Sequence, residues 1–349
     1  MKDFRGIKEG HLRLFPMTVL LGANNSGKTT VLEALYLLYA PGPTCLSTYA
    51  VEKPDQTQVL TIAEVIHTYH TIWSSRGYRF LLHNYDGIAM INCHLVRGDE
   101  YRSRSIAFRG VREGVEVRGP TEVPEYPEYM PDLMKVPRSA ILGDDGIVHP
   151  RKLSMSKSLL MKPHLVELAL TYVKMNWGLI RSRGLTGKVA NELSRLVNED
   201  YDDLTLEPHI GGGLSLNVIL RKTRRGIRLS DMGDGVRMLA IAMLLKELTS
   251  AELLLWDDVE AFMSPSSLIY LAQWMANLVE QGIQVVVATH SREAAEILMG
   301  AAEEAGQEAR AVLLALRNGI LKSKVLTLDD VRKYREAGVD IRMAEGYIL

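Results

Sequence analysis

Eight consecutive residues near the start of the chain have the types and spacing of a phosphate-binding loop. From Gly22 to Thr29 the chain reads GANNSGKT, which matches the pattern G-x-x-x-x-G-K-[ST]. Glycines let such a loop fold tightly with its N–H groups turned toward an anion. Lys28 would reach the β- and γ-phosphates, and the Thr29 hydroxyl would bind Mg²⁺. The loop therefore predicts an ATP and Mg²⁺ site, against the alternative of a fortuitous glycine-rich turn. The expected nucleotide-binding residues are Gly22, Asn24, Asn25, Ser26, Gly27, Lys28, Thr29 and Thr30.

Two acidic residues follow a short apolar run later in the chain. Leu253–Trp256 is followed directly by Asp257 and Asp258. Carboxylates at the C-terminal end of a parallel strand lie where ligands bind in open α/β sheets. Asp257 is suited to hold Mg²⁺, and Asp258 is suited to orient or deprotonate an attacking water. The alternative is a solvated junction between strand and loop, which the phosphate loop elsewhere in the chain disfavours.

Two further motifs offer polar groups to a nucleotide. The apolar run Val285–Ala288 ends in Thr-His-Ser, and His290 at that sheet edge can hydrogen-bond a γ-phosphate or the attacking water. The alternative is a histidine satisfied by nearby backbone. The sequence LSDMGDG at 229–235 precedes a predicted helix, so it forms either a second anion site or an ordinary capped helix start. The candidate residues are Ser230, Gly233, Asp234 and Gly235 in this motif, with Lys28, Asp258 and His290 for catalysis.

The elements that would position these motifs alternate between strand and helix. A strand over 17–21 precedes the phosphate loop and a helix over 29–39 follows it. After residue 229 strands again alternate with helices, which predicts an α/β fold with a mostly parallel sheet covered on both faces. The expected segments are 1–43 and 204–349 for the two parts of a nucleotide-binding core, 44–155 for an antiparallel β insertion and 156–203 for a short helical arm.

Composition argues against several classes of protein. The 349 residues carry 41 Lys and Arg against 42 Asp and Glu, and this balance does not suit a nucleic-acid coat or a polybasic membrane binder. Two cysteines cannot build a disulfide framework. We find no apolar run near the ~18 residues of a membrane span and no signal-peptide core. We therefore expect a cytoplasmic protein without a membrane partner.

Three weaker signals have open interpretations. Residues 221–226 (RKTRRG) form a basic turn that is either solvated or a contact for DNA. His67 and His70 lie on a predicted helix, but no third ligand nearby supports a metal site. The runs 78–82 and 88–92 have β-type composition and flank a turn, so both are predicted as strands.

Taken in order, the four motifs resemble the ABC-type ATPase heads, in the branch that contains the structural-maintenance-of-chromosomes (SMC) and RecF proteins. The order is phosphate loop, long insertion, LS-x-x-G-x-G, apolar strand with acids, and apolar strand with Thr-His-Ser. The segment DFRGIK at 3–8 and the Met-Gly-Asp-Gly of 232–235 are most similar to the OLD-like ("overcoming lysogenization defect") group of AAA-type ATPases. The resemblance covers 1–40 and 204–345 and is vague between them.

The resemblance implies a P-loop NTPase head that acts as an ATP-dependent homodimer. Two heads would sandwich ATP between the phosphate loop of one copy and the 230–235 motif of the other. ATP would close the dimer and hydrolysis would open it, so that the free energy of closure moves attached parts.

Two departures from the family pattern lead to a second hypothesis, which competes with that of an ATPase. Asp258 stands where the family has Glu, and Ser264 stands where it has His. A shorter carboxylate would hold water less well, so turnover is expected to be slow, and the rival is a nucleotide-gated binding scaffold with negligible hydrolysis.

No C-terminal Toprim nuclease is expected. An effector, either a nuclease or a toxin, would then be a separate protein in DNA maintenance or anti-phage defence.

Overall fold

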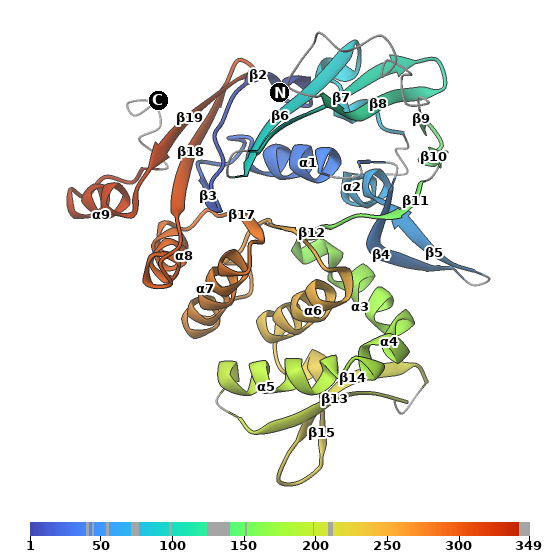
Figure 1. The fold of residues 1–349 in the computed structure, drawn as a ribbon, viewed down its shortest axis with the longest axis vertical. Helices are drawn as coiled ribbons and strands as arrows, with labels where there is room; N and C mark the ends of the chain where they lie inside the picture. The colour runs from blue at the N-terminus through green and yellow to red at the C-terminus, as the bar shows by residue number, and fades with distance from the viewer. Residues whose placement is uncertain are drawn as a thin grey trace.

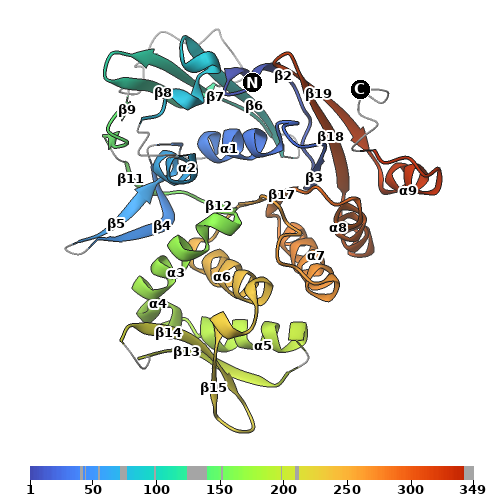
Figure 2. The same ribbon diagram turned by 180° about the vertical axis from the view of Figure 1, so that it is seen from behind.

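The computed structural model describes residues 1–39, 42–43, 45–53, 56–70, 77–97, 100–123, 140–150, 152–197, 199–208 and 212–341. Within these ranges one mixed sheet of 13 strands organises the chain, with helices on both faces (Figures 1 and 2). Its strand order is β10-β9-β8-β7-β6-β1-β2-β19-β18-β3-β17-β16-β12. Two three-stranded sheets, β11-β4-β5 and β13-β14-β15, lie outside it.

Five strands form the parallel core of the large sheet. They are β12 (Ser158–Met161), β16 (Leu253–Trp256), β17 (Gln284–Ala288), β3 (Met17–Leu21) and β18 (Ala309–Arg317). Strands that are covered on both faces consist of continuous apolar runs, and every residue of β3, β12 and β16 is buried. The predicted α/β class with its parallel core is therefore confirmed.

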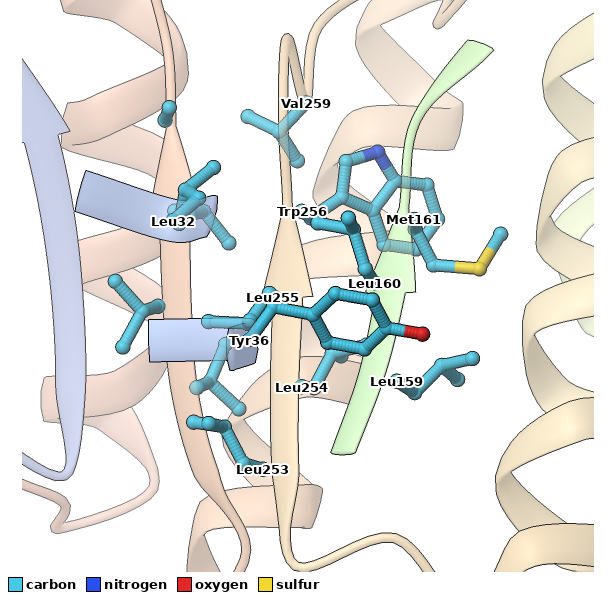
Figure 3. Close-up of a cluster of buried hydrophobic side chains, with 14 of the residues drawn as sticks. Leu32, Tyr36, Leu159, Leu160, Met161, Leu253, Leu254, Leu255, Trp256 and Val259 are labelled. Atoms are coloured by element: carbon cyan, nitrogen blue, oxygen red, sulfur yellow. The ribbon is translucent and has the colours of Figure 1, made fainter. Parts of the chain in front are cut away.

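Helices cover both faces of this core. Helix α1 (Lys28–Leu38) lies on one face, while α6 (Asp234–Thr249), α7 (Pro265–Glu280) and α8 (Arg292–Glu304) lie on the other (Figures 1 and 2). Tyr36 of α1 lies over β16 and β12, and Leu32 of the same helix lies over β17 (Figure 3). Full burial of an aliphatic or aromatic side chain contributes roughly 1.5–3 kcal/mol, so these contacts fix the helix that follows the phosphate loop.

The expected antiparallel insertion is present, and it extends the core sheet. Four of its strands pair in sequence, namely β6 (Ile88–Arg97), β7 (Glu100–Val111), β8 (Gly114–Val123) and β9 (Ala140–Gly143), and β10 (Val148–His149) adds an edge. They reach the core through β1 (Lys2–Phe4), β2 (Ile7–Gly10) and β19 (Ile320–Leu326). The small sheet of β4 (Cys45–Lys53), β5 (Gln56–Thr61) and β11 (Lys152–Met155) completes the insertion.

Two local predictions in the middle of the chain are wrong. The run 78–82 holds the 3₁₀ turn η1 (Arg79–Leu81), and a second turn, η2 (His83–Tyr85), follows it. Leu81 and Leu82 are apolar because they are buried against the hydrophobic core. Residues 158–161, expected in the helical arm, form the edge strand β12 of the parallel core. A run of four apolar residues is too short for its period to separate strand from helix.

The helical arm and a β hairpin form a lobe beneath the core (Figure 1). Its elements are α3 (Val166–Met175), α4 (Trp177–Ser182), α5 (Leu185–Val197), β13 (Tyr201–Pro208), β14 (Leu214–Leu220) and β15 (Gly226–Arg228). The basic turn follows β14. Arg221 forms ion pairs with Asp200 and Asp202, and Arg224 forms one with Asp202. These pairings favour the solvated turn over a DNA contact.

The last described elements are a hairpin and a helix. Strands β18 and β19 meet at Asn318 and Gly319, both with positive φ (50° and 78°), as an Asn-Gly hairpin turn requires. Helix α9 (Leu328–Glu336) follows, and the sequence analysis missed it. Thr327 and Asp330 form a reciprocal capping box at its start, a signal that could have predicted the helix.

A buried ion cluster ties α1 to the insertion. Glu33, on α1, is almost fully buried and pairs with Arg5 from the β1–β2 turn. Its other oxygen accepts a hydrogen bond from His70 Nε2 at 2.8 Å, at the end of α2 (Ile62–His70). Burial, with the nearby charges of Arg5 and Lys162, lowers the pKa of His70 to about 3, so this ring is a neutral donor at pH 7.

We expect Glu33→Ala to lower the free energy of unfolding by about 3–5 kcal/mol, because it leaves the Arg5 charge in a poorly solvated position without its carboxylate. Chemical denaturation of the two proteins measures this change. Glu252→Ala is the matched control, because Glu252 pairs with Lys157 at an exposed site where an ion pair contributes about 0–1 kcal/mol. Equal losses in the two variants would contradict a structural role for the cluster.

Candidate functional site

The phosphate loop joins β3 to α1 and has the backbone that its sequence predicts. Gly22 and Gly27 have positive φ values of 151° and 93°. A side chain at Gly22 would bring a Cβ atom within 2.5 Å of the Leu314 carbonyl oxygen, so only glycine fits there. Asn25 is also left-handed at 62°, a conformation that asparagine tolerates better than most residues. Asn24 and Asn25 are exposed, Ser26 is buried, and Thr30 is partly buried on α1.

Lys28 lies folded over this loop. Its Nζ donates hydrogen bonds to the carbonyl oxygens of Gly22 and Ala23, both at 2.9 Å, and lies 3.3 Å from Ser26 Oγ. His290 Nδ1, at the end of β17, is 3.5 Å from the same nitrogen. The ammonium is therefore held where the loop N–H groups and the N-terminus of α1 favour an anion.

The metal-binding candidates Thr29 and Asp257 are in direct contact. Thr29 Oγ1 donates to Asp257 Oδ2 at 2.9 Å, which links the start of α1 to the end of β16. A hydroxyl and a carboxylate are oxygen ligands of the kind that Mg²⁺ prefers, and its remaining ligands would be phosphate oxygens and water. Among the described residues no group of three His, Cys, Asp or Glu side chains can hold an ion alone. The donor set thus fits Mg²⁺ that arrives with a nucleotide.

The sequence analysis missed one residue of this site. Lys162 directly follows β12, and its Nζ lies 3.0 Å from Asp257 Oδ2. Had 158–161 been recognised as a parallel strand beside 253–256, its next residue would have been expected at the same sheet edge as Asp257.

Asp258 and His290 lie together at this edge. Asp258 Oδ1 is 3.7 Å from His290 Nε2, and both side chains are partly exposed. Burial and the neighbouring Asp257 carboxylate raise the pKa of Asp258 above its ordinary value. Asp258 has a left-handed backbone with φ of 51°, where Asp is enriched relative to longer side chains. A partly exposed carboxylate with a raised pKa is chemically suited to accept a proton from water.

Glu260 positions the segment that carries His290. Its Oε1 accepts from the His290 backbone N–H and its Oε2 accepts from Thr289 Oγ1, both at 2.7 Å. The His290 backbone is thus held by a carboxylate, while its ring faces Lys28 and Asp258.

The 230–235 motif stands apart from the residues above. Ser230 lies in the 3₁₀ turn η5 (Leu229–Asp231), and Asp234 is the first residue of α6, with its carboxylate 3.0 Å from Arg237. Gly233 is the N-cap residue, with φ of 89° and no side-chain cap, so Ser230 does not cap this helix. A Cβ at Gly235 would lie 2.6 Å from the Phe262 carbonyl oxygen. Helix α6, which follows this motif, and helix α1, which follows the phosphate loop, cover opposite faces of the sheet (Figures 1 and 2).

A phosphate loop between a central parallel strand and its helix, with acidic and histidine-bearing strand ends beside it, defines the class of protein. The fold is that of a P-loop ATPase-like head. A family profile described as "AAA domain, putative AbiEii toxin, Type IV TA system" matches residues 178–295, about a third of the chain. The matched segment includes the 230–235 motif, Asp257, Asp258 and His290.

A relative and several solved structures are similar to the chain. "Uncharacterized protein MJECL11" of Methanocaldococcus jannaschii is 34% identical over 113 residues, which are 99% of that protein and 32% of this chain. The SMC head domain from Thermotoga maritima aligns over 93% of this chain and 96% of its own, with a TM-score of 0.46 and 14% identity. The Smc head from Pyrococcus furiosus, bound to the C-terminal domain of ScpA, aligns over 96% and 97%, with a TM-score of 0.45 and 14% identity. The chain belongs to the same family as the M. jannaschii protein.

None of the helices in the described ranges is both long and apolar enough to cross a bilayer.

Proposed function

We propose that this protein binds Mg-ATP and hydrolyses it at the site formed by β3, α1, β16 and β17. The observation that carries the proposal is the 2.9 Å contact between Thr29 Oγ1 and Asp257 Oδ2, beside an ammonium held in the loop. In this site Lys28 and the loop N–H groups bind the phosphates, and Thr29 with Asp257 holds Mg²⁺. Asp258 takes the proton of the attacking water, and His290 orients that water or the γ-phosphate.

We further propose that ATP closes a head-to-head homodimer and that hydrolysis opens it. Ser230, Gly233, Asp234 and Gly235 would contact the nucleotide held by the other copy. Support comes from their place at the start of α6, on the opposite face of the sheet from α1. A second copy could present these residues to the nucleotide held by the phosphate loop of the first.

A second candidate is a nucleotide-gated scaffold with very slow hydrolysis. Asp258 favours it, because this carboxylate is short and 46% exposed and lies 3.7 Å from His290, beyond a hydrogen bond. In either case we propose a cytoplasmic head that acts with a separate effector, a nuclease or toxin, in DNA maintenance or anti-phage defence. The toxin system in the name of the matching family suits this context. DNA binding by the turn 221–226 is less favoured, given its internal ion pairs. Membership of the OLD-like group stays a prediction.

The dimer is tested by light scattering during gel filtration, with and without ATP and Mg²⁺. We expect wild type to shift from monomer to dimer with ATP. Ser230→Arg should bind a fluorescent ATP analogue normally yet remain monomeric, because a bulky cation there blocks the second copy. Ser182→Arg, an exposed serine on α4, is the matched control and should dimerise. Equal dimerisation of Ser230→Arg, or a wild type that stays monomeric with bound ATP, would contradict the proposed dimer.

A further inference from the structure

The ammonium group of Lys162 forms an ion pair with the Asp257 carboxylate, which would also have to bind the Mg²⁺ of a bound nucleotide. Lys162 Nζ lies 3.0 Å from Asp257 Oδ2, the same oxygen that accepts from Thr29 Oγ1 at 2.9 Å. The Lys162 side chain is 15% exposed and that of Asp257 is 3% exposed. This is therefore a poorly solvated ion pair inside the site, unlike a pair formed by mobile surface side chains.

The sheet register fixes the position of Lys162. Strand β12 runs parallel to β16 with Met161 paired to Trp256, and the Asp257 N–H donates to the Met161 carbonyl oxygen at 2.9 Å. Lys162 and Asp257 are thus the next residues of two paired strands. Their side chains are brought together by main-chain hydrogen bonds, so the ion pair is part of the architecture of the sheet edge.

The charges around the pair show why the lysine is needed when no metal is bound. Three carboxylates lie just after the C-terminal end of β16, namely those of Asp257, Asp258 and Glu260. Facing them are Lys28, Lys162 and His290. Lys28 is held by the loop carbonyl oxygens of Gly22 and Ala23, so Lys162 is the cation that directly neutralises Asp257. A buried carboxylate without such a partner is strongly unfavourable.

We propose that Lys162 is the resident counter-ion of Asp257 and that Mg²⁺ must displace it when Mg-nucleotide is loaded. A divalent ion on Asp257 Oδ2 would repel an ammonium held at the same oxygen, because both are cations in a site with little water. The Lys162 ammonium would move away from Asp257, and the carboxylate would then be neutralised by the bound Mg²⁺. This inference rests on the proposed Mg-ATP site.

Displacement of the Lys162 side chain from Asp257 would affect the start of the helical arm. Lys162 is followed directly by the 3₁₀ turn η4 (Pro163–Leu165) and then by α3, so it is the first residue between the sheet and the arm. When its side chain leaves Asp257, the restraint on this connection is released. Metal loading at the active site is thereby coupled to the segment 163–175.

The test is a Mg²⁺ titration of the binding of a fluorescent ADP analogue to the full chain. We expect Lys162→Met to reach half-maximal binding at a Mg²⁺ concentration roughly tenfold or more below that of wild type, since tenfold corresponds to about 1.4 kcal/mol. Lys157→Met is the matched control, because Lys157 precedes β12 and pairs with Glu252 at an exposed site, and its midpoint should equal that of wild type. Chelation of Mg²⁺ by the analogue in solution is the same for all proteins.

An unchanged Mg²⁺ midpoint in Lys162→Met would overturn the proposal. A higher midpoint would also overturn it, because it would show that Lys162 helps to bind the phosphates. If Lys162→Met does not fold, Lys162→Gln removes the charge and keeps a hydrogen-bond donor, and the same shift is expected. In wild type, amide hydrogen exchange of residues 163–175 should rise with Mg-nucleotide but not with nucleotide in EDTA, and equal exchange in both would overturn the proposal. A wild type that binds no nucleotide at any Mg²⁺ concentration would instead refute the proposed function.

Discussion

Lys28→Ala is expected to abolish measurable nucleotide binding and to lower ATP turnover at least about 100-fold, because it removes a fixed positive charge from the place where the transferring phosphate develops charge. The side chain is buried and held by the Gly22 and Ala23 carbonyl oxygens at 2.9 Å. Without it, the loop N–H groups and the helix N-terminus remain, and these cannot replace a charge that would contact both the β- and γ-phosphates. Phosphate release and binding of a fluorescent ATP analogue are the measurements.

The control for this experiment is Lys333→Ala, which removes an exposed lysine on α9 that pairs with Asp329. It should retain wild-type turnover. Circular dichroism of Lys28→Ala checks that the variant is folded, so that a loss of binding can be assigned to the missing charge. Release of phosphate by Lys28→Ala at the wild-type rate would exclude this loop as the catalytic site and, with it, the proposed ATPase.

The parts of the fold that could be predicted are those whose pattern is local. The buried strands 17–21 and 253–256, the helix after the phosphate loop and the Asn-Gly hairpin each carry their own signal in adjacent residues. The candidate residues Lys28, Thr29, Asp257, Asp258 and His290 converge for the same reason, since each directly follows a recognisable strand or belongs to a motif.

The parts that could not be predicted depend on contacts between distant segments. Strand β12 is recognisable as a strand only through its pairing with β16, and Lys162 therefore had no assigned place. Glu33 fits the predicted helix after the phosphate loop, and nothing near it in the sequence indicates a buried ion pair. Its partners Arg5 and His70 come from other elements of the fold. The apolar side chains of Leu81 and Leu82 suggested a strand. They are apolar because they are buried, although they lie in or beside a 3₁₀ turn.

Asp258→Asn is expected to lower turnover at least about 100-fold while nucleotide binding is retained, because general bases typically contribute 10²–10⁴-fold. The amide keeps the size of the side chain and tolerates the left-handed backbone at φ of 51°, so the fold should not change. Asp329→Asn, on the exposed first turn of α9, is the matched control. A variant that hydrolyses ATP as fast as wild type would show that another group accepts the proton.

The pH dependence of wild-type turnover gives an independent signature of the same carboxylate. A general base works only when it is ionised, and burial, the largest cause of the shift, raises the pKa of Asp258 even where Mg²⁺ would neutralise the neighbouring Asp257. Turnover should therefore decline with falling pH at values above the ordinary aspartate pKa of about 3.9. The log of kcat against pH should show this limb in wild type. The residual activity of Asp258→Asn should not show it.

Asp258→Glu decides between a true ATPase and a nucleotide-gated scaffold. Two effects oppose each other. The added methylene lengthens the reach of the carboxylate, whereas a left-handed backbone costs an L residue roughly 1–2 kcal/mol, a cost that the short side chain of Asp can offset by local hydrogen bonds better than Glu can. If wild type is a scaffold limited by the short reach of Asp258, the gain in reach dominates and turnover rises sharply. If wild type already hydrolyses ATP efficiently, the backbone strain dominates and turnover falls. The left-handed conformation thus offers a physical reason for aspartate at this position, and the sign of the change in kcat tests it.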